Sequence, residues 1–460
     1  MTAPAASKPG PMTMIVLLAA TFLGTVSNNV VNVVLPTLDR DLGVQPSGGV
    51  LVVSGFVVVL AAATPVTGWI GDRFGRRRTL LIALILMAGA MAGAALAPSL
   101  PVLVLFRACQ GLACAAIPPA VMGMLAARSG PGRRIRVMGA WATANGVGQA
   151  AGPPLGGFVG DALGWRAIFW LLAVLSVLVA AGAIWRVPAD RGRRTSLHWP
   201  GAGSLTVGAA LVMTAATAVS QPVVPRRAVA LLAVVGLALL VVFVVVSRAA
   251  SRPLIPPRSL VETRFLRSVV AAFAQMFCLA ALLVTIPLYL SGSLGSDTVT
   301  TGLLVFSLPA AMALLAPAVA ALGERAGPRR VLRTGLVILV AVPLLLGLRL
   351  DRQEHHLVVL AAMMSAAGAG IALVQTPSAS GATRSPGGPS GASLGLFTMA
   401  RFTGSAFGTA WVALTYQHAT FAVLFGGCAV VAAIALCVSF AGPNPTPLPA
   451  NAGTRATTPA

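Results

Sequence analysis

The chain has 460 residues, of which 57% are hydrophobic and only 9% charged, and its formal net charge is +22 at pH 7. The hydrocarbon core of a bilayer is about 30 Å thick, and an α-helix of roughly 20 apolar residues crosses it. Long uninterrupted runs of Leu, Val and Ala exclude the alternating pattern of a transmembrane β-barrel. We therefore predict an all-α polytopic membrane protein.

Fourteen apolar segments are each about long enough to cross the membrane as a helix. The third and fourth are the least clearly separated, because only Pro98, Ser99 and Pro101 interrupt the apolar run. In chain order the predicted spans are 13–37, 49–71, 79–98, 101–127, 137–159, 165–185, 200–220, 227–247, 266–290, 300–323, 330–349, 356–379, 390–414 and 419–441.

The two ends of the chain are predicted to be short tails. Residues 1–12 are rich in Pro and Ala, and the first apolar segment has no small-residue cleavage site, so we expect no cleaved signal peptide. Residues 442–460 are rich in Pro, Thr and Ala and are expected to be disordered. The five cysteines are scattered within apolar segments without metal-ligand spacing, so neither a metal nor another cofactor is expected.

The basic residues predict the orientation in the membrane. Arginines dominate the loops on the side of the N-terminus, including 73–78, 128–136, 186–194 and 325–333, and are few on the other side. Basic loops remain in the cytoplasm, so both termini are predicted to be cytoplasmic, in a multi-pass protein of the cell (inner) membrane. Short basic loops also suit contact with anionic lipids. No basic domain able to hold a duplex is present, so nucleic acid is not expected as a partner.

A repeated loop divides the chain into related halves. Residues 71–80 and 323–332 both begin with glycine, an acid and arginine, and each follows the second span of a six-span block. Two related halves with a substrate site between them are a recurrent plan of secondary transporters. The predicted parts are a cytoplasmic tail 1–12, an N-terminal six-helix half 13–185, a two-helix insert with its loops 186–265, a C-terminal six-helix half 266–441 and a cytoplasmic tail 442–460.

The first copy of this loop resembles the cytoplasmic motif of the major facilitator superfamily. The resemblance implies the major facilitator fold and a latch that closes one face, since an acid near several guanidiniums forms charge-assisted hydrogen bonds. A basic loop that serves only topology is the alternative. The predicted gating residues are Gly68, Asp72, Arg73, Gly75, Arg76 and Arg77, with Glu324 and Arg325 in the second copy.

The fifth span carries a glycine pattern that looks like the antiporter motif of the same superfamily, which implies an exporter. Its six positions are Gly139, Gly148, Gly152, Pro153, Gly156 and Gly157. Small residues along one helix allow a neighbouring backbone to approach closely, and a Gly-Pro pair permits a local bend.

The fourth span contains Arg107, Gln110 and Gly111, similar to the family's Arg-x-x-Gln-Gly pattern. An arginine inside a span costs about 2.5–3.5 kcal/mol on insertion scales, so a function is its first interpretation; snorkelling to the nearby helix end is the alternative. Together with the span count, the sequence Val33-Val34-Leu35-Pro36 at the end of the first span narrows the resemblance to the drug:proton antiporter branch with fourteen helices.

The chain departs from this branch in its acidic residues. All ten lie in loops or at span ends, and Ser27 occupies the first-span position where the branch usually has an acid. Proton coupling requires a group whose proton affinity changes during the cycle. Asp39 is the candidate proton carrier, and an ordinary solvated helix end is its alternative role. Coupling through Asp72 in the latch, and transport driven by the charge of the substrate itself, are the other two possibilities.

Polar residues within the spans predict a wet central cavity. Each of them has hydrogen bonding to a neighbouring helix as its alternative role. Two arginines without a carboxylate predict a cavity that disfavours dications and accepts neutral or anionic compounds. The predicted cavity residues are Asn28, Asn32, Arg107, Gln110, Asn145, Gln149, Gln275, Gln375 and Arg401.

The leading functional hypothesis is a secondary active exporter of amphipathic small molecules, such as drugs or an antibiotic, working by alternating access with protons as the expected counter-substrate. An uncoupled or charge-driven facilitator, or an uptake carrier, is the alternative. A membrane enzyme or sensor is disfavoured because no catalytic, metal-ligand or phosphate-loop constellation is present. We expect the chain to act as a monomer.

Overall fold

The structure is a computed structural model of the full chain. It describes residues 10–443 except 45, 131–132, 194, 220, 222–223, 294–297, 353–355 and 385–389. Most of both predicted tails, including the expected disorder after residue 442, lies outside the described residues. Every regular element in the described part is a helix, so the predicted all-α class is confirmed.

The first part of the chain forms seven helices, one more than the six predicted spans. The first predicted span, 13–37, is divided at Val30, where the Asn-rich segment ends one helix and a second, containing Pro36, begins. The helices are α1 (Pro11–Asn29), α2 (Val31–Asp41), α3 (Pro46–Phe74), α4 (Arg76–Ala95), α5 (Leu100–Arg128), α6 (Arg134–Leu163) and α7 (Trp165–Arg186).

The second part contains the insert and six long helices. The insert consists of α8 (Trp199–Ala218), α9 (Arg226–Ala249) and the single turn α10 (Pro257–Leu260). The helices that follow are α11 (Thr263–Ser293), α12 (Thr298–Ala326), α13 (Pro328–Asp351), α14 (Leu357–Ala382), α15 (Gly391–Thr415) and α16 (Phe421–Ser439).

Twelve helices among the described residues are long and apolar enough to cross a membrane. The helices α6 and α15, at the predicted fifth and thirteenth spans, are not among them, although they contain 30 and 25 residues. Both contain many glycines, and buried polar residues such as Asn145 and Arg401 lower their hydropathy. The count of fourteen spans therefore remains a prediction.

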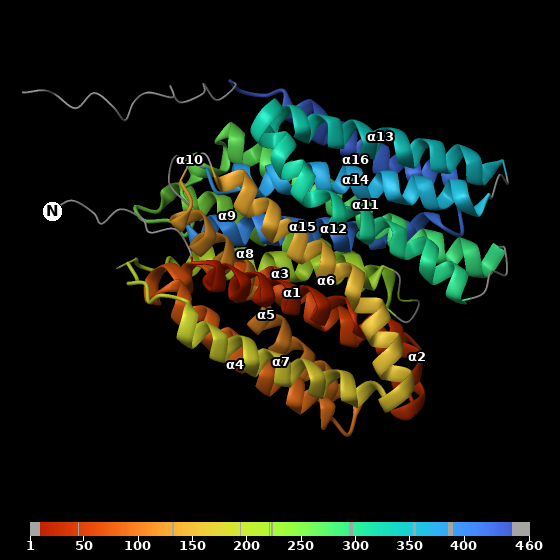
Figure 1. Ribbon diagram of the computed structural model, residues 1–460, viewed down its shortest axis with the longest axis horizontal. Coiled ribbons are helices and arrows are strands. Elements are labelled where there is room, and N and C mark those ends of the chain that lie inside the picture. The colour runs from red at the N-terminus through yellow and green to blue at the C-terminus, as the bar shows by residue number, and fades with distance from the viewer. Residues whose placement is uncertain are drawn as a thin grey trace, which may run out of the picture.

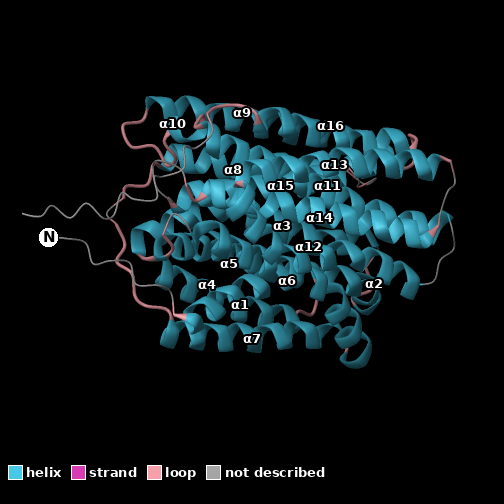
Figure 2. Cartoon of the chain, turned by 45° about the horizontal axis from the view of Figure 1, so that its top comes forward, coloured by secondary structure: helices cyan, strands magenta, loops and turns pink. Residues whose placement is uncertain are grey.

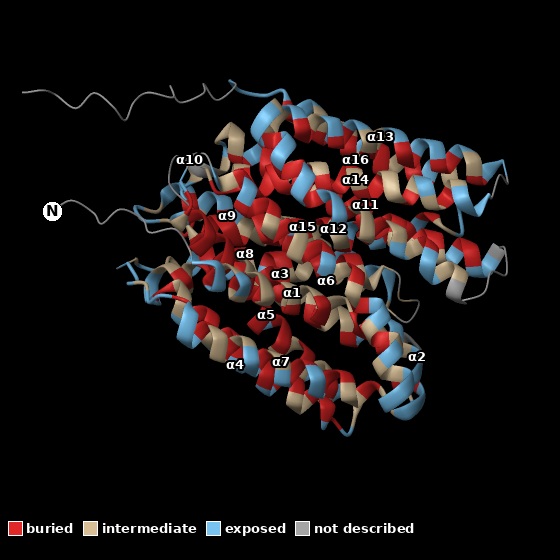
Figure 3. Ribbon diagram, in the orientation of Figure 1, coloured by how far each residue is buried: buried red, intermediate tan, exposed pale blue. Residues whose placement is uncertain are grey.

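The apolar side chains form two main cores. The larger is drawn mainly from α1–α7, and the second entirely from α11–α16. Figure 1 shows the corresponding groups of helices, and Figure 3 shows buried residues along their facing sides. Helix α8 packs on both α3 and α15, and thus on both groups, whereas α9 packs mainly on α8 and exposes Leu231, Val234 and Val241. The exposed apolar face of α9 suits contact with lipid.

The end of the molecule where α3 turns into α4 also holds the α12–α13 turn and the start of α11; we call it the arginine-rich end. Figure 2 shows the loop between α7 and α8 and the short helix α10 at this end. The turns are tight: Gly75 and Gly327 each occupy one position between two helices, with φ of 101° and 87°. A left-handed backbone at this point favours glycine, which explains why both copies of the repeated loop contain one.

Candidate transport cavity and gate

A cavity of about 120 Å³ lies between the two groups of helices. Its walls come from α1, α3, α5 and α6 on one side and from α11 and α15 on the other. The C-terminal wall is largely apolar, with Met276, Leu279, Leu283 and Phe402. The polar residues that line the cavity are Thr21, Thr25, Asn28, Asn29, Asn145, Gln149, Arg401 and Ser405. No carboxylate is among the described lining residues.

Arg401 is the charged residue of this lining. It is 3% exposed and lies on α15, where its Nη2 donates a hydrogen bond to Asn145 Oδ1 at 3.3 Å. Gln149 Nε2 donates to the same oxygen at 2.8 Å, and the guanidinium lies 5.0 Å from the ring centre of Trp141. The cation is therefore held by dipoles and an aromatic ring rather than by an acid, so its charge remains uncompensated next to the cavity.

Four of the nine predicted cavity residues line the cavity: Asn28, Asn145, Gln149 and Arg401. Asn32 does not, because it lies beyond the break at Val30 and is exposed. Gln275 and Gln375 are buried in α11 and α14 away from the lining. Asn29, Thr25 and Ser405 were missed; the polar run at the end of the first span was the available signal for Asn29.

Arg107 and Gln110 form a buried pair behind this lining. Arg107 is completely buried, and its Nη1 donates to Gln110 Oε1 at 2.7 Å and to the carbonyl oxygen of Ser27 at 3.3 Å. Its Nε donates to the Val52 carbonyl oxygen at 3.2 Å, and Phe56 stacks against the guanidinium at 4.4 Å. The side chain thus faces inward rather than snorkelling, and it lies beside the serine at the position where the resemblance implies an acid.

Asp72 connects the two groups of helices at the arginine-rich end. Its Oδ1 accepts a hydrogen bond from Arg76 Nη2 at 2.9 Å, and its Oδ2 accepts one from the backbone N–H of Gly391, the first residue of α15. The carboxylate therefore lies at the positive end of the α15 dipole. The backbones meet closely here, because a Cβ on Gly68 would lie 2.0 Å from the carbonyl oxygen of Gly391.

The second copy of the loop makes the reciprocal contact. Glu324, at the end of α12, accepts a hydrogen bond from Arg136 Nη2 of α6 at 2.7 Å. Beside it, Arg134 Nη1 donates to the carbonyl oxygen of Thr383 at 3.0 Å. Arg325, the other predicted gating residue of this copy, is exposed. Each repeated loop thus binds the opposite group of helices through its acid, and both contacts close the same end.

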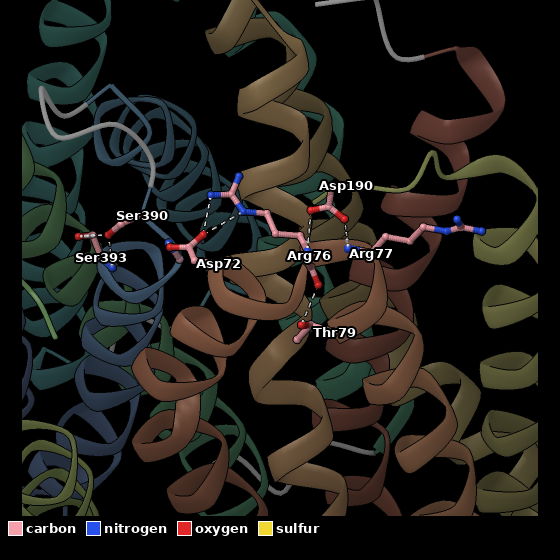
Figure 4. A network of polar contacts seen from close by, with 9 residues as sticks. Asp72, Arg76, Arg77, Thr79, Asp190, Ser390 and Ser393 are labelled. Atoms are coloured by element: carbon pink, nitrogen blue, oxygen red, sulfur yellow. Dashed lines mark hydrogen bonds and ion pairs between the residues drawn. The ribbon is translucent and has the colours of Figure 1, made fainter. Parts of the chain in front are cut away.

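Asp190, which sequence reasoning did not single out, completes the first loop. Its two carboxylate oxygens accept the backbone N–H groups of Arg76 and Arg77 at 2.6 and 2.9 Å, so it caps the start of α4 (Figure 4). Arg73, on the same turn, donates to the carbonyl oxygen of Thr195. An acid within the arginine-rich segment 186–194 was the signal that could have identified this cap.

The glycines of α6 pack against two different neighbours. A Cβ added to Gly148, Gly152 or Gly156 would lie 2.4–2.8 Å from an atom of α1 or of Val30 after it. At Gly139 it would lie 2.5 Å from Ala320 of α12, which belongs to the other group of helices. The two remaining motif positions are looser: Gly157 has only Val33 nearby, at 3.9 Å, and Pro153 is exposed.

Asp39 and Asp41 end α2 in opposite environments. Asp39 is 7% exposed, its Oδ1 has no hydrogen-bond partner, and it lies against Gly49 of α3 rather than in the cavity lining. Burial raises the pKa of its carboxyl. Asp41 accepts hydrogen bonds from Trp165 Nε1 and Arg166 Nη1, and these hold its pKa below the usual value.

Comparison with known proteins identifies the family. The model of the Major Facilitator Superfamily matches residues 17–202, 187–409 and 268–460. The puromycin resistance protein pur8 of Streptomyces alboniger is 29% identical over 89% of this chain and 82% of its own length, and the multidrug resistance protein Stp of Mycobacterium tuberculosis is 27% identical over 84% and 74%.

The fold agrees with solved transporters. The human organic anion transporter MFSD10 (TETRAN) superimposes with a TM-score of 0.70 at 18% identity, covering 94% of this chain and 100% of that one. The proton:xylose symporter XylE gives 0.69 at 14% identity, over 92% and 94%. The chain therefore belongs to the Major Facilitator Superfamily, and it is a multi-pass membrane carrier rather than an enzyme.

Proposed function

We propose that this protein exports amphipathic small molecules, such as drugs or an antibiotic, by alternating access. The observation that carries the proposal is a cavity with one polar and one largely apolar wall, placed between two helix groups that are joined at the arginine-rich end. Relatives named as resistance proteins support export, and the tetracenomycin C resistance and export protein of Streptomyces glaucescens is another, 24% identical over 73% of this chain.

The arginine-rich end is proposed to face the cytoplasm, together with both termini, because basic loops stay on that side. The structure then corresponds to the state that is closed to the cytoplasm. Drug-sized ligands occupy sites of about 300–1,000 Å³, and the cavity here is about 120 Å³. Substrate binding therefore requires the two groups of helices to move apart, as alternating access demands.

The proposal includes fourteen spans, with α6 and α15 crossing the membrane. A helix of 30 residues such as α6 is about 45 Å long, which exceeds the hydrocarbon thickness. It packs on α1 and α12, and α15 packs on α3 and α11. Their buried polar residues Asn145 and Arg401 thus face protein and the cavity rather than lipid.

The charge beside the cavity favours neutral or anionic substrates. Arg401 is buried without a carboxylate partner among the lining residues, and a dication would meet an uncompensated positive charge in a medium of low dielectric constant. Displacement of a bound fluorescent substrate tests this: a neutral drug is expected to compete better than a divalent cationic dye of similar size, and the reverse order would contradict it.

Proton antiport is the proposed driving reaction, with Asp39 and Asp72 as the groups to test. The absence of a carboxylate from the described cavity lining favours a second possibility, in which the charge of the substrate drives transport. The measurement uses everted vesicles that hold a pH gradient reported by a dye, with labelled substrate followed in parallel. Substrate-dependent collapse of the gradient, absent without the protein, is expected for antiport.

Three variants make the measurement specific. Asp39→Asn and Asp72→Asn should reduce the collapse, whereas Asp161→Asn, which neutralises an exposed acid at the end of α6, should not. Labelled substrate that accumulates without collapse of the gradient would favour charge-driven transport. Absence of accumulation for neutral, anionic and cationic compounds alike would refute export.

A further inference from the structure

A second cavity lies away from the proposed substrate site, at the arginine-rich end of the C-terminal helices. It measures about 60 Å³ and is lined by α11, α14 and the start of α13. Four arginines line it: Arg264, Arg267, Arg329 and Arg384. One water centre needs about 10–15 Å³, so the space admits several waters or one tetrahedral oxyanion.

The positive charge around this cavity exceeds what the neighbouring groups neutralise. Arg267 and Arg329 donate to carbonyl oxygens at the end of α16, including that of Ala441. A helix C-terminus supplies only about half a negative charge. Glu262, the nearby acid, accepts the backbone N–H groups of Arg264 and Phe265 and acts on Arg267. Its single negative charge is less than the charge of the four arginines that line the cavity.

Arg384 shows the effect of this crowding. It lies two residues beyond the end of α14, and its pKa is lowered by burial and then by the charges of Arg134 and Arg264. An anion in the cavity would lie among these guanidiniums and relieve their mutual repulsion. Arg264 Nη1 donates to the carbonyl oxygen of Arg384 at 3.3 Å, which fixes the two residues beside each other.

A buried hydroxyl also lines the cavity. Ser380 is 1% exposed, and its Oγ makes no hydrogen bond in the described part of the chain. A buried polar group without a partner costs about 1–3 kcal/mol, and an oxyanion in the cavity would supply an acceptor. Gly381 allows α14 to lie close to α11 at this wall, because a Cβ there would lie 2.2 Å from Ser268 Oγ.

From this arrangement we propose that the cavity binds a phosphate group, held by the forks of Arg264, Arg267, Arg329 and Arg384 and by the hydroxyl of Ser380. Guanidinium groups bind phosphate through paired charge-assisted hydrogen bonds, and basic pockets between transmembrane helices accept lipid headgroups. The phosphate belongs either to an anionic lipid or to a soluble phosphate compound. Bound there, it would link α11, α13 and α14 at their arginine-rich ends.

The test uses the purified full-length chain and two probes. Inorganic phosphate is titrated in neutral detergent at constant ionic strength, and phosphatidylglycerol is compared with phosphatidylcholine by native mass spectrometry of retained lipid. Each arginine near a phosphate contributes about a fivefold change in affinity, so Arg264→Gln with Arg384→Gln should weaken binding about 25-fold. Arg330→Gln, which removes an exposed arginine from α13 outside the cavity, should leave binding within about twofold of the wild type.

Binding of phosphatidylglycerol alone identifies a lipid site, and binding of inorganic phosphate identifies a soluble ligand; either result supports the proposal. Should the double variant fail to fold, Ser380→Asp supplies an anion within the cavity and is expected to abolish binding. Failure of both probes to bind the wild type, or equal losses in Arg330→Gln and the double variant, would overturn the site. Arg267 and Arg329 would then serve only to cap α16. This result is independent of whether the protein exports drugs.

Discussion

Gly156 and Gly157 are adjacent residues of the α6 motif, yet the structure predicts opposite responses to alanine. A Cβ at Gly156 would lie 2.4 Å from the carbonyl oxygen of Val30, whereas at Gly157 its nearest neighbour would be Val33 at 3.9 Å. Carbon atoms pack best at about 3.5–4.0 Å, so Gly156→Ala forces the two backbones apart by on the order of 1 Å. Gly157→Ala meets ordinary van der Waals contact.

Overpacking of this kind costs about 1–3 kcal/mol. Alanine also favours a helix over glycine by about 0.8–1.0 kcal/mol, and at Gly157 this gain is not opposed by a clash. We therefore expect Gly156→Ala to lower the apparent melting temperature in detergent by several degrees, and Gly157→Ala to leave it unchanged or raise it slightly.

The assay is thermal unfolding of the two variants beside the wild type, with substrate accumulation in vesicles as a second measurement. Gly156→Ala should lose activity because α6 can no longer approach the break between α1 and α2, while Gly157→Ala should keep it. Equal losses of thermal stability and of transport in both variants would refute the packing argument, because that argument predicts a clash at Gly156 and none at Gly157.

Three further predictions follow from the charged residues. Asp72→Asn removes the anion at the start of α15, so amide hydrogen exchange there should accelerate; unchanged exchange would argue against a latch. The pKa of Asp41 is lowered in the folded protein, so its ionised form stabilises the fold at pH values above the unfolded pKa of about 3.9. This stabilisation is lost as the pH falls through the lower folded pKa. The pKa of Asp39 is raised, so its ionised form destabilises the fold at neutral pH. Thermal unfolding at pH 7 should show Asp41→Asn less stable and Asp39→Asn more stable than the wild type, and both differences should vanish well below pH 4. A change of melting temperature in the same direction for both variants would be evidence against these two environments. Ser27→Asp gives buried Arg107 a counter-ion and should raise thermal stability at pH 7, and a similar gain in an Arg107→Gln background would show that no such pair forms.

The predicted helices follow from apolar patterning, but the break in the first span does not. The segment 101–127 is predicted as one span and forms α5 (Leu100–Arg128), because a helix satisfies all the backbone groups of a mostly apolar segment in a bilayer. The segment 13–37 has the same appearance, yet the helix is divided at Val30. Where an Asn-rich segment breaks depends on the neighbours that receive it, here Gly152 and Gly156 of α6.

The sequence predicts which kinds of residue form the site, but only partly which of them face the cavity. Arg401 and Asn145 were recognised because polar residues within spans are costly, and the structure joins them at 3.3 Å. Gln275 and Gln375 satisfy the same rule but are buried away from the cavity lining, since composition does not specify which side of a helix faces the centre. The contact between Asp72 and the backbone of Gly391 spans 319 residues and involves no side chain on α15, so no local pattern could have indicated it.

The distribution of acids and arginines constrains how a proton could drive this carrier. The described cavity lining contains Arg401 and no acid. The acids that join the two groups of helices, Asp72 and Glu324, lie at the closed end, and their contacts cross from one group to the other. In the proposed alternating-access cycle, opening that end breaks both contacts. A proton that neutralises either acid would then favour opening without touching the substrate. Coupling in this chain would then act through the conformational equilibrium, and a gate variant would alter the ratio of protons to substrate before it altered substrate affinity.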